Sequence, residues 1–454
     1  MAASTAPTME EELSARVLSL SRQELDDGLR HLLKRNILDS YAGICGSLRD
    51  ARMLATFDRL ADASSGDIAV WGIGRPAALG DAVFANAILG RRSDLLDTYL
   101  APNGMGGAHP SDSVALVLTL ADWLGLTGDQ VLTTAHVAFW LSATFATYYD
   151  PESSGFDHDA VATFSTALTI GQALGCTADE LTLAQRIAGM LGLDTNQAAL
   201  GQVTDWKHCT YASCAVRGLM AVRLARAGFE APPDIYGGVA GVDRFFRHAD
   251  ALFEPPADLG RIVFKRWPAL VFCQTPIDVA LSLADRVTDP AAITDVEVRT
   301  YQVAARNGAT AAAAHPTSRA GRTHSIPYCV ATALLGRVAY EDFDKPCSSD
   351  PTLQSLMGKV RVVVDDEMDA GYPQGAPCAI TVTLSDGATV EARRDRPVGD
   401  PGDPLTDAQL EAKLRQQLFF VDEQEQDVVI ACLQTLEARP DVQPLLAPLR
   451  RRLV

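Results

Sequence analysis

The spacing of apolar residues changes twice along the chain, and this change constrains the fold more than any other feature. Up to about Gly260, apolar side chains recur every three or four residues, as in RQELDDGLRHLLKRNIL, which is typical of amphipathic helices. The segments KVRVVVDDEMD and AITVTLSDGATVEARR instead alternate apolar and polar residues, and Asp386-Gly387 interrupts the second segment as in a β-hairpin. Helical spacing returns after the Pro/Gly/Asp-rich stretch DRPVGDPGDPLT. A strand-containing unit therefore stands between two helical ones.

We predict a mainly α fold, with a large all-helical domain and a smaller α+β domain. The expected boundaries place the helical domain at residues 1–260, a lid-like α+β domain at 261–398, and C-terminal helices that return to the helical domain at 399–454. With 454 residues and 47% hydrophobic content, the chain is long enough for two such cores. Within the α+β domain, we expect DVEVRTYQVAAR to be a strand that includes Tyr301 and Val303, and HSIPYCVATALLGRV to be a helix.

Capping motifs predict where several helices begin. Thr127 and Thr177 are each followed three residues later by Gln or Glu, within two similar segments offset by 50 residues, LGLTGDQVLTTA and LGCTADELTLA. This weak internal repeat indicates a helical hairpin that is used twice. By the same spacing, Ser21 and Thr406 are predicted to begin two further helices.

Charge and cysteine usage restrict the partners and the compartment. A formal net charge of −18 argues against nucleic acid and anionic membranes as partners, because a phosphate-binding face would have to overcome the repulsion of the whole chain. The acidic N-terminal stretch does not resemble a signal peptide, and no apolar run reaches about 18 residues. Nine cysteines without a C-x-x-C pair favour buried thiols in a reducing compartment, so we expect a cytoplasmic protein.

The stretch DLLDTYLAPNGMGGAHPSD, residues 94–112, gathers polar side chains between two apolar helical runs. It holds Asp94 and Asp97, Thr98, and His109 directly before a proline. Polar groups on a loop between packed helices are typical of a functional site. Helix capping and turn formation would also account for these residue types, so the stretch by itself leaves both interpretations open.

Lysines and histidines further along the chain favour a site for carboxylates. The sequence has no H-E-x-x-H, no G-x-S-x-G, no Walker lysine and no metal-ligand cluster, so we expect neither a metal nor another cofactor. Cationic side chains bind carboxylates, and a histidine beside them can move a proton. The candidate residues for such a polycarboxylate site are Asp94, Asp97, Thr98, His109, His158, Lys207, Lys265, His324 and Tyr328.

Several segments, taken in order, resemble the MmgE/PrpD family of 2-methylcitrate dehydratases and their relatives. The resemblance runs from near Leu13 to the C-terminus. It is carried by FANAILGRRSDLLDTYLAP, GGAHPSDSVALVLTLADWL, GFDHDAV, DWKHCTYASCAVRG, KRWPALVFCQTPIDVALSLA and THSIPYCVATALLGRV.

This resemblance implies a site in a cleft between a large helical domain and a smaller α+β domain, in a protein that is usually a homodimer. The catalytic residues that it implies are Asp94, His109, His158, Lys207 and Tyr328. The substrate-binding residues are Asp97, Thr98, Lys265 and Gln274. His208 is interpreted only as a neighbour of Lys207, and His324 as a possible helix cap.

The resemblance also implies a metal-free hydro-lyase, most simply one that dehydrates 2-methylcitrate or a related 2-hydroxy tricarboxylate to 2-methyl-cis-aconitate. Lys207 and Lys265 would hold carboxylates, His109 or His158 would remove the proton next to one of them, and the other histidine or Tyr328 would protonate the leaving hydroxyl. The dehydratase branch of the family is favoured by HPSD with ADWL, by GFDH and by Gln274. Two segments near the expected substrate, NGMGG and HCTYASC, depart from the family pattern.

Three alternatives remain open at the level of the sequence. The same proton abstraction would serve a cis-aconitate decarboxylase that forms itaconate, or a dicarboxylate epimerase. A non-catalytic relative that acts as a binding subunit is the third.

Overall fold

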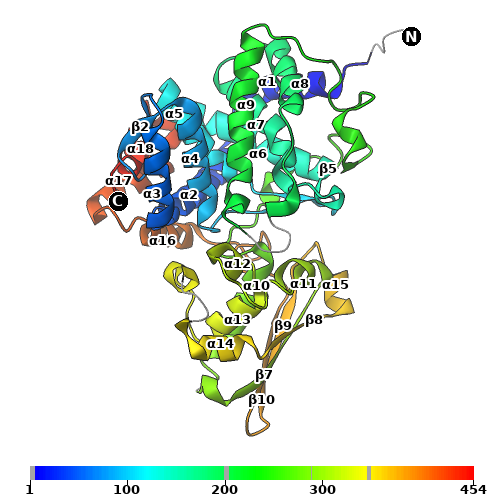
Figure 1. Ribbon diagram of the computed structural model, residues 1–454, viewed down its shortest axis with the longest axis vertical. Coiled ribbons are helices and arrows are strands. Elements are labelled where there is room, and N and C mark those ends of the chain that lie inside the picture. Colours follow the sequence, from blue (N-terminus) through cyan, green and yellow to red (C-terminus); the bar gives the residue numbers. More distant parts are fainter. Residues whose placement is uncertain (1–5, 199–203, 288, 345–348) are drawn as a thin grey trace.

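Two hydrophobic cores organise the computed structural model, which describes residues 6–198, 204–287, 289–344 and 349–454. One core draws on residues from Leu13 to Phe264 and again from Leu405 to Leu449, and the other on residues from Ala269 to Val382. Figure 1 shows the first as the upper, helical body and the second as the lower body that carries the sheet. The predicted mainly α fold is confirmed. We propose that the two cores correspond to the predicted domains.

Helices from both ends of the chain build the first core. Tyr41 donates a hydrogen bond of 2.8 Å to the backbone oxygen of Leu445, so an early helix and the last one lie side by side. The helices are α1 (Met9–Arg22), α2 (Asp27–Ser47), α3 (Ala51–Asp62), α4 (Leu79–Arg92), α5 (Asp112–Leu124), α6 (Gly128–Tyr148), α7 (Ala162–Ala173), α8 (Ala178–Met190), α9 (Thr210–Arg226), α16 (Asp407–Gln417), α17 (Glu423–Gln434) and α18 (Gln443–Leu449).

The predicted helix starts are confirmed at three positions and wrong at one. Thr127, Thr177 and Thr406 form reciprocal capping boxes at the starts of α6, α8 and α16. Ser21 instead lies in the last turn of α1, where its hydroxyl donates to the Val17 carbonyl at 2.7 Å. Asp26 caps α2, because a carboxylate placed directly before the first turn accepts an otherwise unpaired backbone N–H.

A four-stranded sheet with the order β10-β9-β7-β8 is the centre of the second core. The predicted hairpin at Asp386-Gly387 is confirmed, since β9 and β10 are antiparallel and Gly387 has φ +85°. The elements are β7 (Ile293–Thr300), β8 (Val360–Val364), β9 (Cys378–Leu384), β10 (Thr389–Arg394), α10 (Val271–Ala284), α11 (Gln302–Gly308), α12 (Arg319–Thr323), α13 (Ile326–Leu334), α14 (Pro351–Met357) and α15 (Asp366–Ala370).

The strand predicted through Val303 ends earlier, at Thr300. Tyr301 precedes α11 and Val303 lies inside it. Tyr301 and Ala304 are the buried residues here, and their three-residue spacing fits a helix better than a strand.

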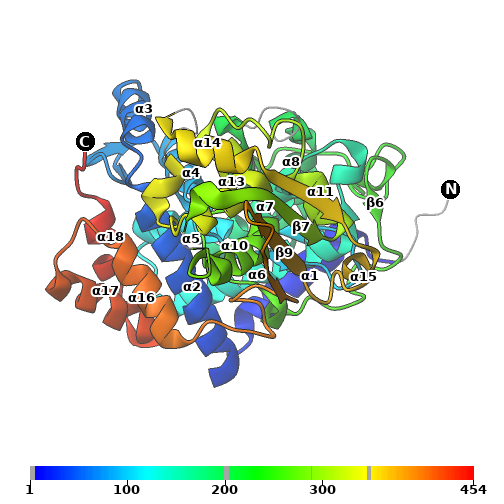
Figure 2. The same ribbon diagram turned by 90° about the horizontal axis from the view of Figure 1, so that it is seen from below.

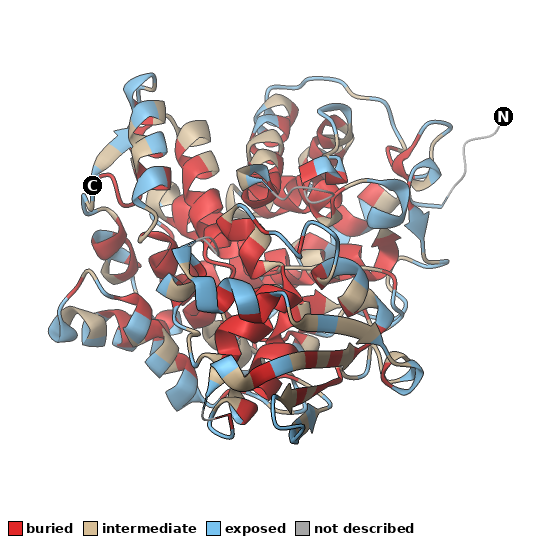
Figure 3. Cartoon of the chain, turned by 60° about the horizontal axis from the view of Figure 1, so that its bottom comes forward, coloured by how far each residue is buried: buried red, intermediate tan, exposed pale blue. Residues whose placement is uncertain are grey.

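The two units meet over a largely buried surface. Figure 2, seen from below, shows the sheet and its helices lying across the helical body, and Figure 3 shows buried segments concentrated where both bodies come together. Three small antiparallel ribbons complete the helical body: β1 (Ile68–Val70) with β2 (Arg75–Ala77), β3 (Tyr99–Leu100) with β4 (Gly107–Ala108), and β5 (Tyr149–Asp150) with β6 (Arg247–His248). Across the described ranges, every helix is too short or too polar to cross a bilayer.

Candidate active site

The polar stretch 94–112 forms a ribbon that is tied to the segment leading from the helical body into the α+β unit. Strands β3 and β4 bring its two ends together, and Gly104, with φ +68°, forms part of the turn. The backbones of Thr98 and Val263 exchange two hydrogen bonds of 2.9 and 2.8 Å. Asp94 has φ +59°, a left-handed conformation that is unfavourable for a side chain with a Cβ atom. The fold therefore holds Asp94 in a strained backbone position at the junction of the two units.

The first group of charged residues, called here the helical-side cluster, consists of Arg91, Asp157, His158, Asp159 and Lys207. The Lys207 ammonium lies 2.8 Å from Asp157 Oδ2 and 3.3 Å from His158 Nδ1. Arg91 lies 3.2 Å from Asp159 Oδ2 and 3.1 Å from His158 Nε2. Four of the five residues are buried and His158 is nearly so, which makes each ion pair strong and the loss of either partner costly.

Short local elements place this cluster. Asp157 caps the 3₁₀ turn η2 (His158–Val161) by accepting from the backbone N–H of Asp159 at 3.0 Å. Lys207 comes from η4 (Asp205–His208), directly before α9. Burial opposes ionisation of Asp157, yet Lys207 and His158 lower its pKa below the usual range. The carboxylate therefore stays charged and holds the lysine in place.

The second group, the junction cluster, consists of Asp94, Lys265, Thr323 and His324. Thr323 donates to Asp94 Oδ2 at 2.6 Å. Lys265 and His324 lie farther away, at 3.9 and 3.7 Å from the Asp94 carboxylate. Burial lowers the pKa of Lys265, which is fully enclosed and has this carboxylate as its main counter-charge. The two elements that carry Thr323 and Asp94 belong to different units, so this cluster exists only when the units are together.

Four buried or nearly buried histidines face these clusters, and backbone carbonyls determine where two of them carry the proton. His109 Nδ1 lies 2.5 Å from the Asp97 carbonyl and His324 Nδ1 lies 2.8 Å from the Ala320 carbonyl, so each donates through Nδ1 and keeps a lone pair on Nε2. Each ring nitrogen of His158 instead lies between a cation and a carboxylate: Nε2 is 3.1 Å from Arg91 and 3.4 Å from Asp159, and Nδ1 is 3.3 Å from Lys207 and 3.1 Å from Asp157. Burial lowers the pKa of His109, His158, His208 and His324, so all four rings are neutral at pH 7.

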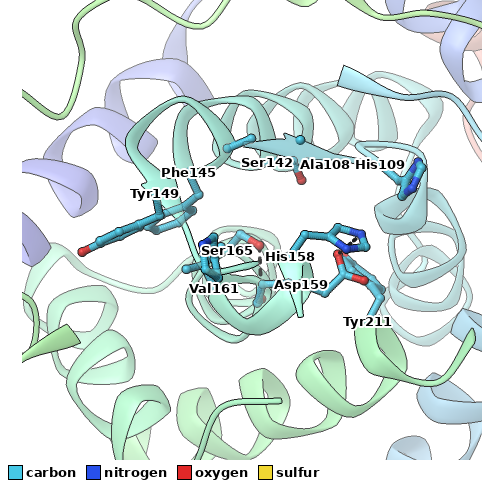
Figure 4. A pocket seen from close by; sticks show the side chains of 14 residues that line it. Ala108, His109, Ser142, Phe145, Tyr149, His158, Asp159, Val161, Ser165 and Tyr211 are labelled. Carbon is cyan, nitrogen blue, oxygen red and sulfur yellow. Dashed lines mark hydrogen bonds and ion pairs between the residues drawn. The ribbon is translucent and has the colours of Figure 1, made fainter. Parts of the chain in front are cut away.

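His109 and His158 also line a cavity that runs beneath the β3–β4 ribbon. Their rings meet edge to face with centroids 5.4 Å apart. Figure 4 shows both at one end of the cavity with Asp159 and Tyr211, and Phe145 and Tyr149 at the other end. The arrangement places a neutral ring nitrogen with a lone pair next to cationic side chains.

Three predicted site residues have partners within the protein scaffold. Asp97 Oδ1 accepts from the Ser111 backbone N–H and hydroxyl at 3.1 and 2.6 Å, and burial raises the Asp97 pKa to about 7. Gln274 exchanges hydrogen bonds of 3.0 Å with the Trp267 backbone. The Tyr328 hydroxyl donates to the Asp342 carbonyl at 2.9 Å. Asp97 thus braces the loop, Gln274 braces the turn before α10, and Tyr328 lies in the second core.

Site residues that sequence analysis left out are Arg91, Arg92 and Thr323, whereas His324 was a candidate and His208 was interpreted only as a neighbour of Lys207. Arg91 and Arg92 lie in the quoted segment GRRSDLLD at the end of α4, but two arginines at a helix C-terminus are most simply explained by the helix dipole. Thr323 is adjacent to the quoted HSIPY segment. The positions of these residues in the sequence give no regular spacing that would identify them as site residues, because their partners are far away in the sequence.

A cleft between the two units adjoins the junction cluster and is rich in arginine. Its acidic residues, Asp50, Asp205 and Asp344, are outnumbered by arginines. A positive entrance attracts polyanions over several ångströms. The lining arginines are Arg49, Arg52 and Arg92 from the helical body, and Arg319 and Arg322 from α12.

Asp157, His158 and Asp159 lie close enough together to share a cation. Lys207 already contacts Asp157 and Arg91 already contacts Asp159, so two protein cations occupy the positions that a metal ion would take. The donor set is therefore engaged in ion pairs.

Comparison with known sequences agrees with this architecture. The sequence model of the MmgE/PrpD N-terminal domain matches residues 11–253, and that of the MmgE/PrpD C-terminal domain matches residues 267–437. The chain is 29% identical to the 2-methylcitrate dehydratase of Cupriavidus necator over 79% of its length and 80% of the relative's. It is 27% identical to the Escherichia coli K12 2-methylcitrate dehydratase over 68% of each chain. It is 24% identical to the human cis-aconitate decarboxylase over 89% of this chain and 86% of the relative. The chain belongs to the MmgE/PrpD family.

Proposed function

We propose that the protein is a hydro-lyase that dehydrates 2-methylcitrate or a related 2-hydroxy tricarboxylate. The observation that carries this proposal is the pairing of neutral His109 with two buried lysines that come from opposite sides of one site. The dehydratases among the relatives support the same reaction class. The ammonium groups of Lys207 and Lys265 would each bind a substrate carboxylate. Lys207 would then give up part of its contact with Asp157, and Lys265 part of its contact with Asp94.

His109 is the best-placed base. Its Nδ1–H is held by the Asp97 carbonyl, so its Nε2 lone pair is available to accept the proton from the carbon next to a carboxylate. As that C–H bond breaks, negative charge moves onto the carboxylate oxygens, where a lysine ammonium stabilises it. The carbon–carbon double bond then forms as the C–O bond breaks.

The leaving hydroxyl requires a proton, and His109 has just acquired one. We propose that the His109 imidazolium returns this proton to the departing oxygen, so that water is released and the neutral base is restored. The Tyr328 hydroxyl already donates to a backbone carbonyl, and His158 is held between Arg91 and Asp157. A one-base reaction therefore requires no rearrangement of these residues.

Proton NMR in D₂O tests the proposal. The purified, chelator-treated protein is incubated separately with 2-methylcitrate, citrate, cis-aconitate and an aminodicarboxylate. A new alkene methyl signal from 2-methylcitrate is the expected result. Itaconate signals from cis-aconitate would favour the decarboxylase instead. Deuterium exchange without net reaction would favour an epimerase, and the absence of any change would favour a binding protein. Loss of activity on chelation would contradict a metal-independent reaction.

We also propose a cytoplasmic homodimer. The cysteines in the described part of the chain are free and buried, as suits a reducing compartment. Large apolar side chains are exposed on and around α8 and α9, namely Met190, Trp206, Met220, Phe229 and Phe245, and exposed apolar surface favours association. Light scattering coupled to size-exclusion chromatography should give twice the mass of one chain, and a monomer would contradict this assembly.

A further inference from the structure

His208 combines deep burial with an unpaired hydrogen-bond donor. Its Nδ1 lies 3.1 Å from Nη1 of Arg92. Because a guanidinium only donates, Nδ1 must accept, and the ring proton is on Nε2. Within the described ranges, this Nε2 is buried and without a hydrogen-bond partner. A buried N–H without a partner costs free energy, so such a group in a native fold calls for a functional explanation.

His158 shows how both nitrogens of a buried histidine can have partners within the protein. Arg91 and Arg92 are consecutive residues of α4, and each donates to the ring nitrogen of a different histidine, His158 or His208. The second nitrogen of His158 is satisfied, since it lies 3.1 Å from Asp157 Oδ1. The second nitrogen of His208, by contrast, has no such partner within the described part of the chain.

The surroundings of His208 place it at the junction cluster. The residue follows Lys207 directly in η4. Arg92 is held by Asp50 and Asp205 at 2.7 and 3.0 Å, so the donor to Nδ1 is fixed. The charged and titratable groups that act on the ring are Arg92, Asp94, His324 and Arg91. His208 therefore contacts Arg92, which lines the arginine-rich cleft, and lies near Asp94 of the junction cluster.

We propose that His208 is a further catalytic residue, whose neutral Nε2–H donates a hydrogen bond to the substrate carboxylate that becomes an enediolate. This inference rests on the proposed function. No proton leaves His208, because the proton from carbon goes to His109, and the hydrogen bond only shortens as negative charge grows on the oxygen. Arg92 keeps the ring neutral by occupying Nδ1, and burial lowers the pKa of the imidazolium further.

A neutral donor suits this reaction better than a charged one. A charged imidazolium would bind the ground-state carboxylate strongly, and the part of its interaction that is already present in the enzyme–substrate complex does not lower the barrier. A preorganised neutral donor contributes mainly as charge develops on the oxygen. The lysines supply both binding and charge stabilisation, whereas His208 contributes chiefly to kcat.

Two variants of His208 and one matched control test the role. His208→Leu should lower kcat by about 10²–10³-fold, the range for one lost donor to a developing oxyanion, with KM changed less than about threefold. His208→Gln places an amide N–H near the position of Nε2 and should recover at least about tenfold of the loss. His136→Leu removes another buried imidazole, outside both clusters, whose Nδ1 likewise has no partner in the described residues, and should leave kcat unchanged. A His208→Leu enzyme within threefold of the wild-type kcat, or a Gln variant as slow as the Leu variant, would refute the proposal.

A second measurement does not depend on turnover. Nitrogen-15 NMR of histidine-labelled protein, with the His208 ring assigned by its loss in His208→Gln, should show a neutral Nε2–H tautomer from pH 8 to pH 6. Addition of tricarballylate should shift the Nε2–H proton downfield. An Nδ1–H tautomer, a charged ring or no shift would overturn the inference. Lack of turnover by the wild-type protein would refute the proposed function alone.

Discussion

The two charged clusters hold a lysine each, yet they hold it differently. In the helical-side cluster, Lys207 lies 2.8 Å from Asp157, and all the partners belong to the helical body. In the junction cluster, Lys265 is 3.9 Å from Asp94, and the closest partner of that carboxylate, Thr323, comes from the other unit. The first arrangement needs residues of the helical body alone, whereas the second needs residues of both units. The position of Lys207 is therefore independent of the α+β unit, whereas the anchoring of Asp94 depends on how the two units are placed.

Replacing each lysine by methionine should separate stability from activity. Lys207→Met leaves Asp157 buried without its cation, so we expect the free energy of unfolding to fall by about 3–5 kcal/mol. Lys265→Met leaves Asp94 with its Thr323 hydrogen bond and should cost less than half of that. Activity on the tricarboxylate should fall by orders of magnitude in both. Urea unfolding and initial rates measure the two effects, and equal losses of stability would erase the distinction between the clusters.

Removing the proposed base should cost about 10²–10⁴-fold in kcat, the range for general base catalysis. His109→Gln keeps a polar side chain near Asp97 but has no basic nitrogen. Circular dichroism should remain that of the wild type. Turnover within tenfold of the wild type would exclude His109 as the base and direct attention to the Nε2 lone pair of His324.

Loss of the Thr323 hydroxyl should loosen the junction cluster alone. A hydrogen bond to a charged group is worth about 1.5–3 kcal/mol, so Thr323→Val should lower kcat/KM by roughly 10–100-fold. Thr300→Val removes a buried hydroxyl that donates to the Pro377 carbonyl within the same unit, and serves as the control. Equal effects of the two substitutions on kcat/KM would mean that the Asp94 contact has no special role.

The acidic limb of the pH profile should lie lower than for an ordinary histidine. Burial and the nearby Arg91 and Lys265 lower the pKa of His109 well below 6.5, so the ring stays neutral and basic as the pH falls through 6.5. The value of kcat/KM should therefore hold through pH 6.5 and decline only below it. A midpoint at or above pH 6.5 would show that the base is a more exposed histidine.

Asp97→Asn should have the smallest effect. Burial raises the Asp97 pKa from 3.8 to about 7, so the stabilisation from its protonated form is complete below pH 3.8 and is lost as the pH rises through about 7. The asparagine keeps an acceptor for Ser111 and cannot ionise. The variant should match or exceed the wild-type Tm at pH 8 and lose this advantage at pH 5. A large loss of stability at pH 8 would mean that the ionised Asp97 carboxylate stabilises the fold, which contradicts a raised pKa.

Much of the fold could be read from local patterns. Helical periodicity, the capping boxes at Thr127, Thr177 and Thr406, and the Asp386-Gly387 hairpin depend on residues a few positions apart, so a sequence contains all that is needed to predict them. The errors at Ser21 and at Tyr301 arose where two local interpretations fit equally well. In each case a buried side chain or a competing cap decided the outcome.

The sequence by itself determined which chemistry was available: lysines, histidines and carboxylates in a mainly α chain, in an order that resembles one family. Only the tertiary structure decided which of these side chains contact one another. The proton position on His109 and His208 depends on Asp97 and Arg92, and the anchoring of Asp94 depends on Thr323, 229 residues away. A hydrogen bond acts through space over about 3 Å, so its partner leaves no regular spacing in the chain.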